Sequence, residues 1–383
     1  MRFFNKPQRC RFCLRLVILS LFCALPLAAP AEGGRFTDPD DGRFDVSEHL
    51  LQYSGVLPVP IIVTEPALDF GGGLAALWFS ESIASAGSRG LAETGRQTPP
   101  AIGGLFGFKT GNGSWGGGGG FFAPLAGDRF RYLGGLGKVG LNLDYYSPTG
   151  RASGYSLEGA GIVQQILARV GDSDWFIGPR YVYVDADSRF SRERPREVTP
   201  RELETRIGML TLVVDYDSRD NLFTPSRGTF MEAELATVRE ALGANVEYDY
   251  YAVRAFHYQP LGQSLVLGLR GDARSAGNEA PFFAQPYVTL RGIPAARYQD
   301  TRTAVVEAEL RWNIDERWAL VGFAGSGKAF GKRADWEKAE TVNAGGIGFR
   351  YLIARKLGLY VGADIARGPE ENAIYLQVGS AWR

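Results

Sequence analysis

Few residues in this chain could carry out chemistry. It contains only two histidines, His49 and His257, and His257 lies in an alternating stretch rich in tyrosine and phenylalanine, residues 248–258. A hydrolase built on a serine–histidine pair would need a serine beside His257 in space, which spacing along the chain does not provide. An ordinary structural histidine is the better interpretation, so we predict no catalytic residue.

The glycine run Gly116–Gly120 is a second candidate, as a cradle for phosphate. It has neither the following lysine nor the strand–loop–helix context that a phosphate loop needs. We interpret it as part of a flexible strand, and we predict no cofactor.

All three cysteines, Cys10, Cys13 and Cys23, lie in the first 31 residues. This stretch has five basic residues, then the apolar run Leu16–Leu27, then small residues at a cleavage site, which is the pattern of a secretory signal peptide. We predict that residues 1–31 are removed. The mature chain then has no thiol, which excludes disulfides, thiolate metal sites and a cysteine nucleophile.

Charge and composition narrow the class of protein further. Without the signal peptide, 37 basic residues face 42 acidic ones, a balance of −5 that argues against a nucleic-acid partner. The 50 glycines in 383 residues are about twice the usual share and favour curved strands over helices. After residue 31 no run of 18 apolar residues remains, so the sequence predicts no helical membrane span.

In segment 303–314 charged residues alternate with apolar ones. Glu307, Glu309 and Arg311 occupy one face, and every residue between them on the other face is apolar. In a membrane strand, such a segment has one face toward lipid and the other toward a polar lumen. A soluble β-sandwich also alternates, but the signal peptide and the recurrence of the pattern favour the barrel.

Two later segments repeat the alternation. Segment 357–365 sets apolar residues against Asp364 on the opposite face, and the last ten residues place Ile374, Leu376, Val378 and Trp382 on one face. Ending on Trp382, this final strand resembles a membrane strand that finishes in an aromatic girdle. We take Tyr375 and Trp382 as the C-terminal strand signal.

Fifteen strands can be read from these patterns. They are expected at about 67–80, 100–111, 114–124, 129–146, 153–169, 174–189, 204–217, 228–240, 246–259, 264–275, 303–314, 317–330, 340–353, 356–366 and 373–382. Bacterial barrels have an even number of strands, so we predict a sixteenth before residue 200, either in Val56–Val63 or within 129–189. The predicted fold is all-β, a sixteen-stranded antiparallel transmembrane barrel over residues 66–383, after a short periplasmic lead-in at 32–65. The long connections 81–99, 190–203 and 276–302 are expected on the outside.

Two connecting segments stand out. The first runs from Asp217 through Arg219, Asp220 and Pro225 to Gly228 and is rich in turn-forming residues. The second, 287–300, has Leu290–Arg291–Gly292–Ile293 at its centre, inside an unusually long connection. A long loop with apolar residues around an arginine is expected to fold against something, and the charged lumen is available.

At these two segments the chain resembles the BamA/TamA superfamily of outer-membrane barrels, also called the bacterial surface antigen family. The resemblance rests on the turn 217–228, on the Leu290–Ile293 core, on the glycines that open the barrel after residue 70, and on the C-terminal strand. It covers nearly all of the mature chain. It implies that the loop folds into the lumen and that its arginine, Arg291, pairs with acidic residues on the next two strands.

Not every position follows the family pattern. Glu309–Leu310–Arg311 matches the first partner strand, but Gly325 stands where the second strand would carry an aspartate, and Ile293 replaces an aromatic residue. The resemblance therefore predicts that Arg291 relies on Glu309 alone and that the loop is held less firmly. Residues 32–65 are too few for a POTRA domain, which puts recruitment of substrates by that route in doubt.

The resemblance implies a bacterial outer-membrane barrel that inserts or translocates outer-membrane components through a seam between its first and last strands. Its expected partners are outer-membrane lipid and other outer-membrane proteins or lipids as substrates. A passive pore or structural barrel remains the alternative, and a barrel enzyme acting through His257 is a third.

Overall fold

The computed structural model describes residues 36–95, 98–148 and 150–382, so the predicted signal peptide lies outside the described residues. The chain divides into two units, Met1–Phe44 and Asp45–Arg383. The described part of the first unit is a short turn in which Thr37 and Phe44 form an isolated β-bridge. Among the described residues, no helix is both long and apolar enough to span a bilayer.

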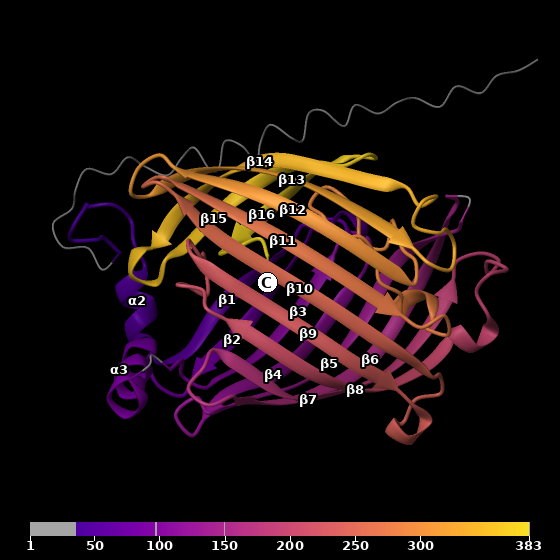
Figure 1. Cartoon of the computed structure of the whole chain (residues 1–383), viewed down its shortest axis with the longest axis horizontal. Helices are drawn as coiled ribbons and strands as arrows, with labels where there is room; N and C mark the ends of the chain where they lie inside the picture. The colour runs from indigo at the N-terminus through magenta and orange to yellow at the C-terminus, as the bar shows by residue number, and fades with distance from the viewer. Residues whose placement is uncertain (1–35, 96–97, 149, 383) are drawn as a thin grey trace, which may run out of the picture. The chain divides into compact units, whose positions relative to one another are not determined.

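The second unit is a single antiparallel sheet of sixteen strands that curls into a nearly closed barrel (Figure 1). The strands are β1 Gly55–Val63, β2 Gly71–Phe79, β3 Ile102–Thr110, β4 Trp115–Leu125, β5 Phe130–Tyr146, β6 Ala152–Arg169, β7 Trp175–Phe190, β8 Glu204–Asp217, β9 Gly228–Val238, β10 Tyr248–Leu261, β11 Leu265–Ala276, β12 Arg302–Asn313, β13 Trp318–Phe330, β14 Thr341–Ala354, β15 Leu359–Arg367 and β16 Asn372–Val378. Each strand pairs with its neighbours in sequence. The prediction of a sixteen-stranded barrel is confirmed.

The helical elements are short. They are α2 Ser47–Gln52, α3 Ile83–Thr94 and the 3-10 turns η1 Pro66–Leu68, η2 Pro200–Glu202, η3 Glu240–Leu242, η4 Phe282–Ala284 and η5 Arg355–Leu357. The Ser82 side chain caps the start of α3 by accepting a hydrogen bond from the Ser85 N–H, and Gly95 ends the helix in the left-handed conformation.

The sixteenth strand is β1, one of the two places expected for it. The barrel thus begins at Gly55, and the boundary expected at residue 66 is wrong, because Gly55–Val63 pairs along its whole length with β2. The apolar, β-branched residues of Val56–Val63 favour a strand, but the two prolines among them obscured it in the sequence.

Adding β1 changes which end of the barrel each connection occupies. We call the end where the chain enters β1 the entry end and the opposite end the loop end. Connections 191–203 and 277–301 lie at the loop end, but 80–101 follows an even-numbered strand and lies at the entry end. The expectation that 81–99 shares a side with the other two is therefore wrong, and this segment folds as α3.

Side chains along the strands alternate between the outer and the inner face of the barrel, as predicted. Val306, Leu310 and Trp312 of β12 are exposed on the outer face, whereas Glu307 and Arg311 are buried inside. Residues paired across an antiparallel ladder share a face, so the registers carry this assignment from strand to strand around the sheet. The inward face carries charged side chains on β7 to β12, β14 and β15 but is mostly apolar on β13 and along β1–β6, a difference that the sequence patterns did not show.

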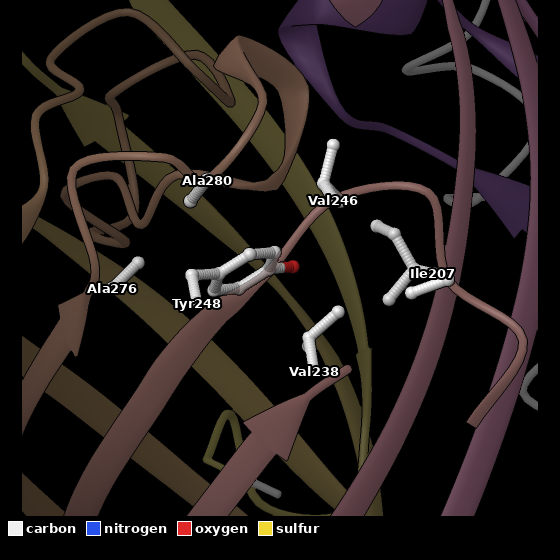
Figure 2. Packing of buried hydrophobic residues seen from close by; sticks show 7 residues of the cluster. Ile207, Val238, Val246, Tyr248, Ala276 and Ala280 are labelled. Atoms are coloured by element: carbon white, nitrogen blue, oxygen red, sulfur yellow. The ribbon is translucent and has the colours of Figure 1, made fainter. Parts of the chain in front are cut away.

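Buried apolar clusters close the loop end over the strands. One consists of Ile207, Val238, Ala244, Val246, Tyr248, Ala276 and Ala280. Figure 2 shows Tyr248 of β10 between Val238 and Ile207 on one side and Ala276 and Ala280 on the other. A second cluster brings Phe282 of η4 against Tyr145, Tyr155 and Val198. These contacts fix the connection 277–301 across strands on both sides of the barrel.

At the entry end the chain is tied to the barrel before β1 begins. The fully buried Arg317, in the β12–β13 turn, donates from Nη1 to Asp45 Oδ2 at 2.6 Å and to the Leu352 carbonyl at 3.0 Å. The Arg355 N–H donates to the same Asp45 oxygen at 2.9 Å. Burial alone would raise the pKa of Asp45, but hydrogen bonds from Ser47, Arg317 and Arg355 lower it from about 3.8 to about 2.

Replacing Asp45 with Asn should destabilise the barrel in a manner that depends on pH. The folded pKa of Asp45 lies below its unfolded value, so the stabilisation is fully present above about pH 4 and is lost as the pH falls toward 2. Removing the charge partner of a buried arginine costs about 3–5 kcal/mol near neutral pH. Urea unfolding in detergent micelles at pH 7 and at pH 2 to 5 measures both effects.

Glu48→Gln is the matched control, because the Glu48–Lys356 pair is exposed at the same end. Its effect should be roughly 0–1 kcal/mol. An Asp45→Asn protein as stable as the Glu48→Gln protein at pH 7 would show that the Asp45–Arg317 pair contributes nothing to the stability of the barrel.

Candidate functional site

The connection 277–301 folds back into the lumen and is held there by apolar contacts. Val288, Leu290 and Ile293 are buried in one cluster with Val305 of β12 and Val342 of β14. Ile293 is only 3% exposed, so the isoleucine at the position of the expected aromatic residue still anchors the loop. The loop is thereby fixed against the charged half of the wall.

Arg291 lies between three carboxylates. Its Nη2 is 2.8 Å from Glu307 Oε1 and 2.7 Å from Glu309 Oε2, and its Nη1 is 2.9 Å from Asp364 Oδ2 on β15. The guanidinium also lies 3.5 Å from the centre of the Phe323 ring. Planar guanidinium groups suit such multiple carboxylate contacts and stacking on a ring.

The expectation that Arg291 relies on Glu309 alone is therefore wrong. Gly325 has no carboxylate, but β15 supplies one through Asp364, which is also held by Arg350 of β14 at 2.5 Å. A Cβ at Gly325 would lie 2.6 Å from Leu290 Cδ2. Leu290 thus fills the space beside this strand, and the acidic partner comes from two strands further along the barrel.

Glu307 is the centre of the network. Besides Arg291, its carboxylate lies 3.3 Å from Arg270 Nη1 and accepts a hydrogen bond of 2.8 Å from the Trp382 Nε1–H. Arg270 in turn donates to the Thr289 carbonyl at 3.0 Å and to its hydroxyl at 2.7 Å. A side chain 2% exposed therefore joins two strands, the loop and the C-terminal residues.

Trp382 does not lie in an aromatic girdle. Strand β16 stops at Val378, because Gly379 adopts φ +78°, and the following residues turn into the lumen. There Trp382 is 4% exposed and packs against Phe256 and Tyr258 of β10. Tyr375 also faces inward, and its hydroxyl accepts the Gly292 N–H at 2.9 Å.

The turn 217–228 lies at the entry end, beneath this network. Asp217 pairs with Arg219 at 2.7 Å, and the Asp220 carboxylate accepts the backbone N–H groups of Ser226 and Arg227. Gly228 has φ +102°, and a Cβ there would lie 2.3 Å from the Ser218 carbonyl oxygen. The turn is thus closed by its own side chains.

Arg311 of β12 contacts this turn and is not a partner of Arg291. It donates to the Pro225 carbonyl at 3.2 Å and to the Ser226 hydroxyl at 2.6 Å. The Ser380 N–H donates to the Phe223 carbonyl at 2.5 Å. The turn therefore holds both β12 and the C-terminal residues.

At the loop end, two carboxylates tie the connection 277–301 to other loops. Asp300, 1% exposed, accepts N–H groups from Lys332 and Arg333 in the β13–β14 loop. Glu65, which follows β1, accepts the Ala295 N–H at 2.9 Å, and burial raises its pKa.

Metal-ligating side chains do not gather at any place in the described part of the chain. They contain no group of three or more histidine, cysteine, aspartate or glutamate side chains able to hold a metal ion. His257 is exposed on the outer face, and its Nδ1 lies 2.9 Å from the Thr229 hydroxyl. What the site can do is hold a loop in the lumen through charge pairing.

Arg291→Ala should leave three carboxylates in the lumen without their shared cation. We expect an inserted barrel with lower assembly yield, destabilised by about 3–5 kcal/mol. Arg297→Ala is the control, because Arg297 is in the same loop and pairs with Glu370 at the more exposed loop end. Heat-modifiable mobility and urea unfolding measure the difference, and equal behaviour of the two variants would contradict it.

Gly325→Ala and Gly322→Ala test the packing of the loop on β13. A methyl group at Gly325 would lie 2.6 Å from Leu290 Cδ2 and 2.9 Å from the Val306 carbonyl oxygen, but at Gly322 it meets nothing within 4 Å. We expect the first change to cost roughly 1–3 kcal/mol and the second to be near neutral. Urea unfolding should show that Gly325→Ala costs less in a Leu290→Ala background than alone, with the backbone contact at Val306 keeping the relief partial. An equal cost in both backgrounds would refute the packing argument.

No family model and no curated protein matches the chain. Among solved structures, it is similar to BamA from Haemophilus ducreyi lacking POTRA domains 1–3, with a TM-score of 0.57 and 12% identity over 85% of this chain and 69% of that one. It is also similar to CdiB from Escherichia coli, with a TM-score of 0.56, 10% identity and coverage of 84% and 61%. For CdiB from Acinetobacter baumannii the TM-score is 0.52 and the identity is 9%, over 84% of this chain and 59% of that one. The chain therefore has the barrel fold seen in BamA and CdiB, and it spans about three fifths of the CdiB chains.

Proposed function

We propose that the protein is an outer-membrane barrel that inserts or translocates outer-membrane components through a seam between β1 and β16. One observation carries the proposal. The ladder of the described residues runs from β1 to β16, and none of its registers pairs β16 with β1. The likeness to BamA and CdiB barrels supports the same function class.

The residues on both sides of the seam are poorly suited to pair. Strand β16 has only seven residues, fewer than the roughly 9–11 of a typical membrane strand. Strand β1 contains Pro58 and Pro60, which have no N–H to donate. Proline is tolerated in a strand where its missing donor faces a free edge, so β1 lacks two of the donors that a closed ladder would use. Such a seam would open at low energetic cost.

In this proposal the entry end faces the periplasm. The connection 277–301, which we call the lumen loop, keeps the barrel from being an open pore. Arg291 with Glu307, Glu309 and Asp364 forms what we call the Arg291 cluster. This cluster holds the loop and, with Tyr375 and Trp382, the last strand beside it. The cluster would then set how readily β16 moves away from β1.

A strain lacking the gene should show selective loss of other outer-membrane barrels or phospholipid exposed at the cell surface. Wild-type protein should reverse this defect, and Arg291→Ala should reverse it less well than Arg297→Ala. The outer-membrane proteome and surface-lipid labelling measure the outcome. An unchanged membrane, together with steady open channels in planar bilayers, would instead favour a passive pore.

A further inference from the structure

The chain that leads into β1 crosses the entry end of the seam and is fixed on the far side of it. The Val46 N–H donates to the Ile353 carbonyl near the end of β14 at 2.8 Å. The Lys356 N–H in η5 donates to the Ser47 hydroxyl at 3.0 Å, and the contacts of Asp45 described above add a charge pair. Strands β15 and β16 lie between β14 and the seam, so residues 45–47 reach across the seam at this end.

Segment 292–298 of the lumen loop contacts both edges of the seam at the loop end. On the β16 side, the Gly292 N–H donates to the Tyr375 hydroxyl at 2.9 Å. On the β1 side, three residues further along the loop, the Ala295 N–H donates to the Glu65 carboxylate, also at 2.9 Å. One short piece of backbone thus joins the residues that follow β1 to strand β16.

These loop-end contacts are close near the lumen and looser toward the surface. A Cβ at Gly368, in the β15–β16 turn, would lie 2.1 Å from the Gly292 carbonyl oxygen, so the two backbones are in direct contact. The Arg297–Glu370 pair continues the contact outward, but its side chains are 23% and 27% exposed, so it adds little. The hydrogen bonds of Gly292 and Ala295 are therefore the main contacts at this end.

The middle of the seam has no comparable support. The ladder of the described residues contains no register between β1 and β16, and Pro58 and Pro60 in the middle of β1 have no N–H to donate. Backbone hydrogen bonds between neighbouring strands are what hold a membrane barrel together. The seam is thus held at its two ends and least in between.

We propose that the seam is a framed window: residues 45–47 close its entry end, segment 292–298 closes its loop end, and β1 and β16 separate between the two. This inference rests on the proposed function and concerns how the same seam is controlled. The two sets of contacts share no residue, so loss of one should free only its own end. An opening of this kind keeps both ends of β1 in place.

Distances between paired spin labels test the window in the purified mature chain, refolded in phospholipid vesicles. After residue 31 the sequence has no cysteine, so two introduced cysteines carry the labels. The label positions face outward beside the seam and are 39% to 62% exposed: Val56 with Val378 at the entry end, Ile62 with Ile374 at the loop end, and Leu74, the β2 partner of Pro60, with Leu376 in the middle. We expect narrow distance distributions for both end pairs and a broad one for the middle pair.

Glu65→Ala should broaden the loop-end distribution toward longer distances and leave the entry-end distribution unchanged. Glu371→Ala is the matched control, because this exposed glutamate of the β15–β16 turn accepts the Gly368 N–H through its backbone carbonyl, which alanine retains. Tyr375→Phe tests the other half of the same contact and replaces Glu65→Ala if that variant does not fold. Heat-modifiable mobility confirms folding of each variant.

Asp45→Asn should broaden only the entry-end distribution. Its control is Glu48→Gln, which removes an exposed charge pair at the same end. If Asp45→Asn does not fold, Ser47→Ala removes the acceptor of the Lys356 N–H with less effect on the buried charges.

Equal loop-end distributions for Glu65→Ala and Glu371→Ala would overturn the role of the lumen loop in the window. An entry-end variant that broadens both ends alike would overturn the independence of the two ends, and wild-type end pairs as broad as the middle pair would overturn the window itself. These distances belong to the purified chain and do not depend on the deletion strain. A membrane defect without a framed seam would retain the proposed function and reject the window, whereas a framed seam without a defect would do the reverse.

Discussion

The ion pairs and the hydrogen bond of the Glu307 carboxylate link several parts of this barrel to one another. The carboxylate is buried, and an isolated buried charge is costly, so its partners Arg291, Arg270 and the Trp382 indole each offset part of that cost. Through them it joins β12, β11, the lumen loop and the C-terminal residues. The pairs are coupled: without Arg291, Glu307 would keep Arg270 and Asp364 would keep Arg350, but the charge contacts between the loop and these strands would be lost.

The barrel itself was largely predictable, because a two-residue period sorts side chains between lipid and lumen wherever the two faces differ in polarity. Segment 303–314 shows this well, with Glu307 and Arg311 inside and Leu310 outside. The period is uninformative where both faces are apolar. The apolar inward face of β1–β6 and the proline-containing β1 are therefore harder to predict from sequence, and the end at which α3 lies depends on where β1 is placed.

The candidate site was predictable in part. The Leu290–Ile293 core and the inward direction of Glu309 followed from the sequence, whereas the role of Asp364 did not, although its parity already placed it on the polar face. Which strand lies across the lumen from a loop is set by barrel closure, and no local pattern reports it. The inward turn of Trp382 depends on a single left-handed glycine, Gly379, which alternation alone treats as another strand residue.

The contact between Trp382 and Glu307 has a consequence for the order of folding. Trp382 contacts Glu307, which lies 75 residues earlier in the chain, and through Glu307 it is linked to Arg270, 112 residues earlier. Closing contacts so distant in sequence carries an entropic cost that is recovered only once β12, β15 and the C-terminal residues are all in place. Arg291 and Arg270 already balance the charge of Glu307, so the Trp382 indole adds a hydrogen bond to a carboxylate whose cations come from the connection 277–301 and from β11. The Trp382–Glu307 contact is therefore expected to form late in folding, after the strands that carry its partners have paired.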